Sequence, residues 1–181
     1  LETVGYIITI GISLTNFYNI LSINFIMTLG IILILVHLVL CKEIDITSVS
    51  ITIMSVLYIP YLFNYINYLD NSKYIWFIFI IAFSTDTFAY TIGNLFGKNK
   101  LSPNISPNKT IEGFLGGILG SLSCSLIYAT YFRINPLWQV AILSILGSVI
   151  AQLGDLVASR IKRFTKVKDF GFIMPGHGGV L

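Results

Sequence analysis

The stretch from residue 159 to residue 181 carries residue types that suit phosphate chemistry. Five basic side chains, one carboxylate and a Pro-Gly-His-Gly-Gly turn follow directly on an apolar segment. Lysine and arginine side chains bind phosphate oxygens, and a glycine-rich turn can present consecutive backbone N–H groups to an anion. This stretch predicts a phosphate-handling site at a membrane surface. Its candidate residues are Lys162, Arg163, Lys168, Asp169, His177, Gly178 and Gly179.

Asp155 stands just before this stretch, at the end of an apolar run. If a helix continues through it, Asp155, Ser159, Lys162 and Lys166 lie on one helical stripe at i, i+4, i+7 and i+11. The alternative is a basic anchor that binds anionic lipid headgroups. A plain anchor has no need of a carboxylate in the apolar run or of a glycine-rich turn. His177 is either an ordinary surface residue or a phosphate contact and proton carrier.

A second carboxylate, Asp86, lies inside another apolar run. Asp86, Tyr90, Gly93 and Gly97 follow one helical stripe. An ionised carboxylate within a membrane costs about 2.5–3.5 kcal/mol on insertion scales unless it faces a polar cavity or a partner. We therefore favour a functional role for Asp86 over a glycine-lined packing face with a paired carboxylate.

The segment between residues 101 and 117 is a third candidate for phosphate binding. Thr110 and the Ser-Pro pairs are typical of a helix start, and Lys109 precedes the next apolar run. A helix N-terminus with a nearby lysine can hold a phosphate. The alternative is an ordinary loop followed by a packing motif of small residues, Gly113, Gly116 and Gly117. Spacing alone does not separate these two interpretations.

The composition sets the class of elements that must position these residues. Hydrophobic residues make up 55% of 181, charged residues make up 10%, and the mean hydropathy is +0.85. Soluble domains carry about 25% charged residues. We predict an all-α, polytopic helical membrane protein. Two cysteines, Cys41 and Cys124, exclude a disulfide framework or a cysteine-based zinc site.

Six apolar runs are each close to the length of about 17–25 residues that a bilayer requires. They cover about residues 4–20, 23–40, 50–66, 74–92, 114–132 and 137–157. No repeat or linker divides them. We predict one membrane-embedded domain over residues 1–181, with the motifs in about residues 82–181.

The basic residues predict the orientation of these spans. If the chain alternates sides, nine basic residues share one side and two, Lys73 and Arg133, lie on the other. Short cytoplasmic loops carry such an excess. We expect an integral, multi-pass protein whose polar segments face the cytosol or an equivalent compartment. The nine are Lys42, Lys98, Lys100, Lys109, Arg160, Lys162, Arg163, Lys166 and Lys168.

Four motifs in order along the chain resemble the phosphatidate cytidylyltransferase (CDP-diacylglycerol synthase) family. The most specific is Ser159-x-Ile-Lys-Arg-x4-Lys168-Asp-x-Gly-x3-Pro175-x-His-Gly-Gly179. The others are Asp86-x-x-Ala-Tyr90-x-x-Gly93, Ile105-Ser-Pro-x-Lys-Thr-x-Glu-Gly-x-x-Gly-Gly117 and Gln152-Leu-Gly-Asp-Leu156. The first 80 residues are similar only in being hydrophobic.

The resemblance implies a reaction in which CTP and phosphatidic acid give CDP-diacylglycerol and pyrophosphate, with Mg²⁺ as cofactor. It implies a multi-helix membrane protein, commonly a homodimer, in contact with membrane lipids and with no nucleic-acid partner. It also implies roles for single residues. Asp155 and Asp86 would bind metal; Lys109, Lys162, Arg163 and Lys168 would bind phosphates; Asp169 and His177 would lie near the reacting phosphate; Tyr90, Ser106, Thr110, Glu112, Gly178 and Gly179 would bind substrate.

One departure and two rival interpretations accompany this resemblance. The family pattern continues after His-Gly-Gly with an Asp-Arg-x-Asp element, which this sequence does not contain. We therefore expect the chain as given to lack one metal ligand and to have weak or no activity.

Two other functions are also considered. A CTP-dependent polyprenol or phytol kinase is similar in architecture, but the Lys-Asp…His-Gly-Gly pattern fits cytidylyl transfer better. An anion transporter or lipid-binding membrane protein would predict internal repeats or broken helices, and the sequence has no repeat.

Overall fold

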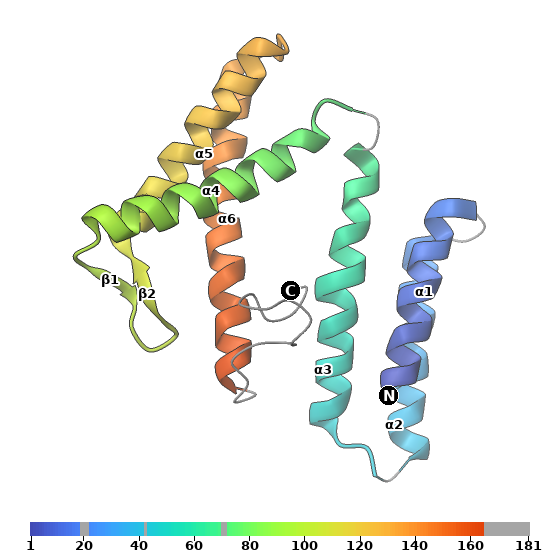
Figure 1. The fold of residues 1–181 in the computed structure, drawn as a ribbon. Coiled ribbons are helices and arrows are strands. Elements are labelled where there is room, and N and C mark those ends of the chain that lie inside the picture. The colour runs from blue at the N-terminus through green and yellow to red at the C-terminus, as the bar shows by residue number, and fades with distance from the viewer. Residues whose placement is uncertain (19–21, 42, 70–71, 165–181) are drawn as a thin grey trace, which may run out of the picture. The chain divides into compact units, whose positions relative to one another are not determined.

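The computed structural model describes residues 1–18, 22–41, 43–69 and 72–164, and it is helical almost throughout (Figure 1). The chain divides into two compact units, Leu1–Ser72 and Lys73–Leu181. Each unit is described by itself below. The organisation of the whole chain as one domain stays a prediction.

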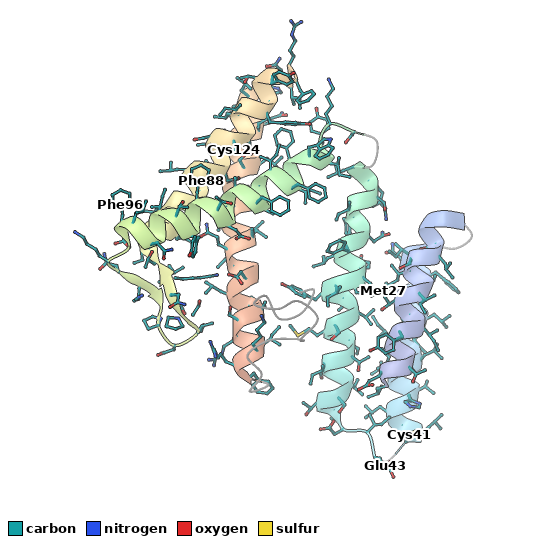
Figure 2. All side chains as sticks on the ribbon, viewed as in Figure 1. Met27, Cys41, Glu43, Phe88, Phe96 and Cys124 are labelled. Carbon is teal, nitrogen blue, oxygen red and sulfur yellow. The ribbon has the colours of Figure 1, made fainter. Side chains whose placement is uncertain are left out.

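The first unit is a packed set of helices. It contains α1 (Glu2–Tyr18), α2 (Ile23–Leu40), α3 (Ile46–Val56), the π-helix η1 (Leu57–Tyr61) and the 3₁₀ helix η2 (Asn64–Leu69). Its core is aliphatic: Met27 of α2, labelled in Figure 2, packs with side chains of α1 and α3. Ser22 and Asp45 begin α2 and α3 by accepting hydrogen bonds from the N–H groups of Phe25 and Ser48.

The second unit holds three long helices and a β-hairpin. Its elements are α4 (Ile75–Phe96), β1 (Lys100–Ser102), β2 (Ser106–Thr110), α5 (Ile111–Tyr131) and α6 (Leu137–Phe164). Helix α5 packs against both α4 and α6, and the hairpin joins α4 to α5 (Figure 1). This unit contains every described residue of the motifs.

The prediction of a polytopic helical membrane protein is confirmed. Within the described ranges, five helical segments are long and apolar enough to cross a membrane: residues 23–40, 46–69, 75–96, 111–131 and 137–164. The first predicted run forms a shorter apolar helix, so five segments meet the length criterion where six were expected. Helix α6 continues seven residues past the predicted end at residue 157, which carries Ser159 and Lys162 onto the same helix as Asp155.

The hairpin corrects the prediction for the segment before α5. The Ser-Pro pairs lie in the hairpin and do not start the helix. Strands β1 and β2 are antiparallel, with Lys100 opposite Thr110 and Ser102 opposite Ser106. Thr110 ends β2 and also caps α5, because its hydroxyl accepts a hydrogen bond from the N–H of Gly113 at 3.1 Å. The predicted role of Thr110 at a helix start is thus confirmed.

Small residues on α5 bring the helices of the second unit close together. A Cβ atom added at Gly113 would lie 2.6 Å from the backbone oxygen of Ala89. At Gly120 it would lie 2.2 Å from the ring of Phe88, which Figure 2 labels on α4. A buried hydrogen bond also joins α4 to α6: the Thr85 hydroxyl donates to the Ser148 hydroxyl at 2.9 Å. Interfaces of small residues and buried hydroxyls are typical of packed membrane helices.

Candidate active site

A polar cavity of the second unit lies where four elements meet. It has a volume of about 610 Å³ and is formed by the C-terminal half of α4, the hairpin, the start of α5 and the later part of α6. The closeness of α4 and α5 at Gly93 and Gly113 fixes one wall. The lining residues are Asp86, Ala89, Tyr90, Gly93, Asn94, Gly97, Lys100, Leu101, Asn108, Lys109, Thr110, Gly113, Phe114, Gln152 and Asp155.

An ion pair crosses this cavity. The ammonium nitrogen of Lys109 lies 2.5 Å from Oδ2 of Asp155, which joins the hairpin to α6. The Lys109 side chain is 25% exposed and that of Asp155 is 58% exposed, so the pair is open to the cavity on the Asp155 side. The two motifs that carry these residues are 46 positions apart in the sequence, and the fold brings them into direct contact.

Asp86 faces the same cavity from α4. Its carboxylate interacts electrostatically with Asp155 and with Lys109. Tyr90, Gly93 and Gly97 follow Asp86 along the cavity wall, as the predicted stripe requires. Asp86 therefore lies beside a polar cavity, which lowers the free-energy cost of a carboxylate within an apolar helix.

The two carboxylates that line the cavity are of the kind that can bind Mg²⁺. Mg²⁺ is commonly held by one or two carboxylates together with substrate phosphates and water. Asp86 and Asp155 provide two carboxylates from different helices on one cavity. Across residues that the structure describes, no cluster of three or more His, Cys, Asp or Glu side chains occurs. Further ligands would thus come from substrate or water, or from residues outside the described part.

Gln152 lines the cavity, although the sequence placed it only within a motif and did not predict it as a site residue. It is 7% exposed, and it lies one helical turn before Asp155. Its side-chain nitrogen donates to the backbone oxygen of Phe114 at 3.2 Å and to the Ser148 hydroxyl at 3.5 Å. A polar residue three positions before a candidate ligand was the available signal, because those positions share a helix face.

Replacing Gln152 by leucine should destabilise the second unit. The change removes both hydrogen bonds and leaves the partly buried Phe114 carbonyl without this donor, at a cost of about 1–3 kcal/mol in the free energy of unfolding. Gln139→Leu is the matched control, because Gln139 is exposed on the same helix. Its expected effect is within about 0.5 kcal/mol. Unfolding of purified protein in detergent measures both, and equal effects would show that the buried hydrogen bonds contribute nothing.

Two predicted substrate-binding residues lie elsewhere. Glu112 does not line the cavity; its carboxylate accepts hydrogen bonds from the backbone N–H groups of Lys98 and Asn99 and from the Asn99 side chain. It therefore fastens the end of α4 to the start of α5. Ser106 is on β2, outside the cavity lining. The structure brings together Asp86, Tyr90, Lys109, Thr110 and Asp155, but neither Glu112 nor Ser106.

The remaining predicted residues follow Asp155 along the chain. Lys162 and Arg163 lie in the last turn of α6, about two turns beyond Asp155, and do not line the cavity. Lysine and arginine at a helix C-terminus also complement the helix dipole. The predictions for Lys168, Asp169, His177, Gly178 and Gly179 fall outside the described residues.

Charge is distributed unevenly between the two ends of the second unit. The cavity end carries Lys100 and Lys109, and the basic last turn of α6 follows it. At the opposite end, the Lys73 ammonium lies 5.6 Å from the centre of the Phe132 ring, and the Lys73 carbonyl accepts a hydrogen bond from the Tyr128 hydroxyl. Among the described residues, the cavity end therefore holds more basic side chains than the opposite end, where Lys73 and Arg133 lie.

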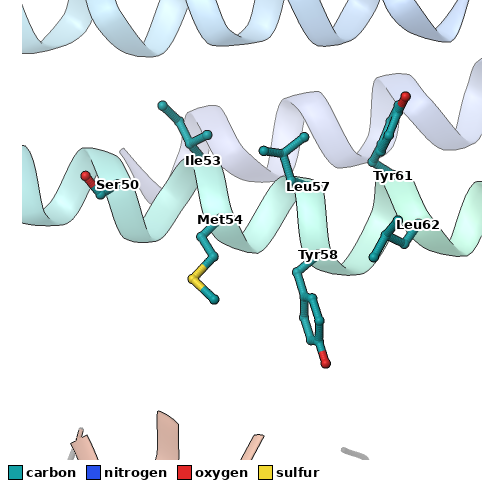
Figure 3. A pocket seen from close by; sticks show the side chains of 7 residues that line it. All are labelled: Ser50, Ile53, Met54, Leu57, Tyr58, Tyr61 and Leu62. Carbon is teal, nitrogen blue, oxygen red and sulfur yellow. The ribbon is translucent and has the colours of Figure 1, made fainter. Parts of the chain in front are cut away.

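A different hollow occurs on α3 and η1 in the first unit. It has a volume of about 570 Å³, and Figure 3 shows Met54 and Tyr58 directed to one side of the helix and Ile53, Leu57 and Tyr61 to the other. Its lining contains no charged side chain. The described lining therefore offers no charged group for phosphate or metal chemistry.

Comparison with known proteins bears on the chemistry of the polar cavity. The sequence model of the cytidylyltransferase family matches residues 2–181. The phosphatidate cytidylyltransferases of Staphylococcus saprophyticus and Staphylococcus haemolyticus are each 46% identical to this chain over 132 residues, which is 71% of this chain and 51% of the relative. That of Staphylococcus aureus is 46% identical over 133 residues. The chain spans about half the length of the curated relatives it matches.

Proposed function

Because the chain belongs to the cytidylyltransferase family, we propose that the protein carrying it transfers the CMP moiety of CTP to phosphatidic acid. The products are CDP-diacylglycerol and pyrophosphate. The observation that carries this proposal is the polar cavity in which Asp86, Asp155, Lys100 and Lys109 gather at one end of an apolar helical unit. The names of the relatives, phosphatidate cytidylyltransferase, support the choice of substrates.

The reaction needs little from the protein beyond charge and position. An oxygen of the lipid phosphate attacks the α-phosphorus of CTP, the bond to the β-phosphate oxygen breaks, and pyrophosphate leaves. The attacking phosphate is already ionised near neutral pH, so no side chain must remove a proton from it. The main obstacle is repulsion between two polyanions. Positioned cations and preorganised dipoles overcome such a barrier.

The cavity residues have groups suited to this task. Lys109 and Lys100 would bind phosphate oxygens, and the cap of α5 at Thr110 places a helix N-terminus beside them. Asp86 and Asp155 would hold Mg²⁺, which when bound supplies positive charge to the transferred phosphoryl group and the departing pyrophosphate. The apolar faces of the helices would keep the diacylglycerol tails in the membrane.

The side of the membrane and the assembly form part of the proposal. The basic end of the second unit would face the cytosol, because cytoplasmic segments carry the excess of lysine and arginine. CTP would then reach the cavity from solution and phosphatidic acid from the surrounding lipid. The homodimer stays a prediction.

An assay with labelled substrate tests the proposed function. Membranes that contain the full-length protein are supplied with cytidine-labelled CTP, Mg²⁺ and phosphatidic acid. The expected result is cytidine label in a lipid, with pyrophosphate released in equal amount. Free CDP together with a newly phosphorylated lipid alcohol, tested in parallel, would instead identify a kinase. If folded protein forms neither product, the result contradicts both enzymatic functions.

A further inference from the structure

The ion pair across the cavity engages one oxygen of Asp155, one of the two carboxylates that the proposed function assigns to metal. Lys109 is 2.5 Å from Oδ2 of Asp155, so its ammonium already neutralises that carboxylate. A divalent cation bound to Asp155 would place its charge close to the same ammonium. Two positive charges at such a distance repel strongly in a partly buried site. A cation therefore binds Asp155 well only if Lys109 moves away.

If Lys109 leaves Asp155, the other carboxylate that lines the described cavity is Asp86, which the proposed function also assigns to metal. Lys109 therefore needs a further anion to keep a counter-charge. Its side chain is 25% exposed, so water reaches it only in part. The four charged residues that line the cavity, two aspartates and two lysines, sum to a net charge of zero. A free divalent cation adds two positive charges to this balanced set. A cation that arrives with nucleotide phosphates brings its own negative charge and offers oxygens to the displaced ammonium.

We propose that Lys109 is a specificity-determining residue that makes the site select the cation–nucleotide complex over the free divalent cation. The ammonium exchanges Asp155 for a nucleotide phosphate when the complex enters. This inference rests on the proposed function for the identity of the ligands. It assigns to Lys109 a control of metal loading in addition to phosphate binding.

Lys100 provides the matched control. It lines the same cavity and carries the same charge, but the ion pair with Asp155 is made by Lys109. Removing either lysine makes the net charge of the cavity more negative by one unit. Only the removal of Lys109 also frees Oδ2 of Asp155. A difference between Lys109→Met and Lys100→Met therefore isolates the direct competition from the general electrostatic effect.

The experiment measures cation binding without turnover. Purified full-length protein in lipid nanodiscs is titrated with Mn²⁺, a spectroscopic substitute for Mg²⁺, with and without CTP and without phosphatidic acid. Electron paramagnetic resonance reports bound Mn²⁺. In the wild type, CTP should strengthen Mn²⁺ binding. Lys109→Met should strengthen binding of free Mn²⁺ about tenfold, within the range of 5–150-fold typical of coupled sites, and should reduce the enhancement by CTP.

Three comparisons decide the outcome. Lys100→Met should change the affinity for free Mn²⁺ less than threefold, and Lys109→Arg, which keeps the ion pair, should behave like the wild type. Lys109→Gln takes the place of Lys109→Met if the methionine variant does not remain folded. Equal effects of Lys109→Met and Lys100→Met, or no enhancement by CTP in the wild type, would overturn the inference. A failure of the labelled-lipid assay with this pattern intact would contradict only the proposed function.

Discussion

Asp155→Asn is expected to reduce cytidylyl transfer by at least about a hundredfold at every Mg²⁺ concentration. The change keeps the size of the side chain but removes the charge that pairs with Lys109 and that the proposed function assigns to the cation. Loss of a supporting group around a metal typically costs 10–100-fold, so loss of a direct ligand should cost at least that much. Initial rates of label transfer from CTP to lipid, measured across a wide range of Mg²⁺, test this prediction.

The control for this change is Asp45→Asn. Asp45 caps α3 in the first unit by accepting a hydrogen bond from the N–H of Ser48, and asparagine caps a helix as well as aspartate does. Activity close to that of the wild type is expected. If Asp155→Asn also keeps this activity, Asp155 is not a metal ligand. If high Mg²⁺ restores its rate, the residue contributes affinity but is not required for the reaction.

Gly113→Ala is expected to separate α4 from α5 and to disable the cavity. The new methyl group would lie 2.6 Å from the backbone oxygen of Ala89 and 3.1 Å from Cα of Gly93. Backbone atoms cannot move aside as a flexible side chain can, so the helices must shift. Overpacking of this kind costs about 1–3 kcal/mol in the free energy of unfolding. Because Gly113 lines the cavity, nucleotide binding should weaken as well.

Gly11→Ala is the matched control for this prediction. Gly11 lies on α1, and an added Cβ would meet Ile26 at 3.4 Å, an ordinary contact. Both substitutions gain about the same helix propensity, roughly 1 kcal/mol. The difference between them therefore reports packing. Thermal unfolding in detergent and CTP binding are measured for both variants, and equal stabilities would mean that α4 and α5 do not approach as closely as the structure has them.

The helices were predictable because long apolar runs have few alternatives in a membrane. The predicted span over residues 114–132 ends within one residue of the end of α5, and the span predicted from residue 137 begins where α6 begins. The hairpin was not predictable in the same way. Its strands are short, polar and interrupted by proline, and they show no alternation of apolar and polar residues.

The site was predictable in part for a related reason. Carboxylates within apolar runs identified Asp86 and Asp155, since such residues are costly without a polar environment. Lys109 was identified by its place just before the next apolar run, near a helix N-terminus. Glu112 was expected in the site only through the family resemblance, and its carboxylate instead accepts hydrogen bonds from backbone N–H groups just after the neighbouring helix. Sequence shows that a carboxylate requires partners, but only the fold shows whether those partners are protein or solvent.

The β-hairpin also determines where the second unit can tolerate changes in length. Strand β2 leads directly into the cap of α5, so an added residue there would displace Lys109 from Asp155. The turn at residues 103–105 lies beyond the last strand pair, and Pro103 and Asn104 are exposed. A short insertion in this turn would extend into solvent while the strand register is kept. This turn is therefore a suitable position for an epitope tag or a fluorescent label that reports on the cavity without entering it.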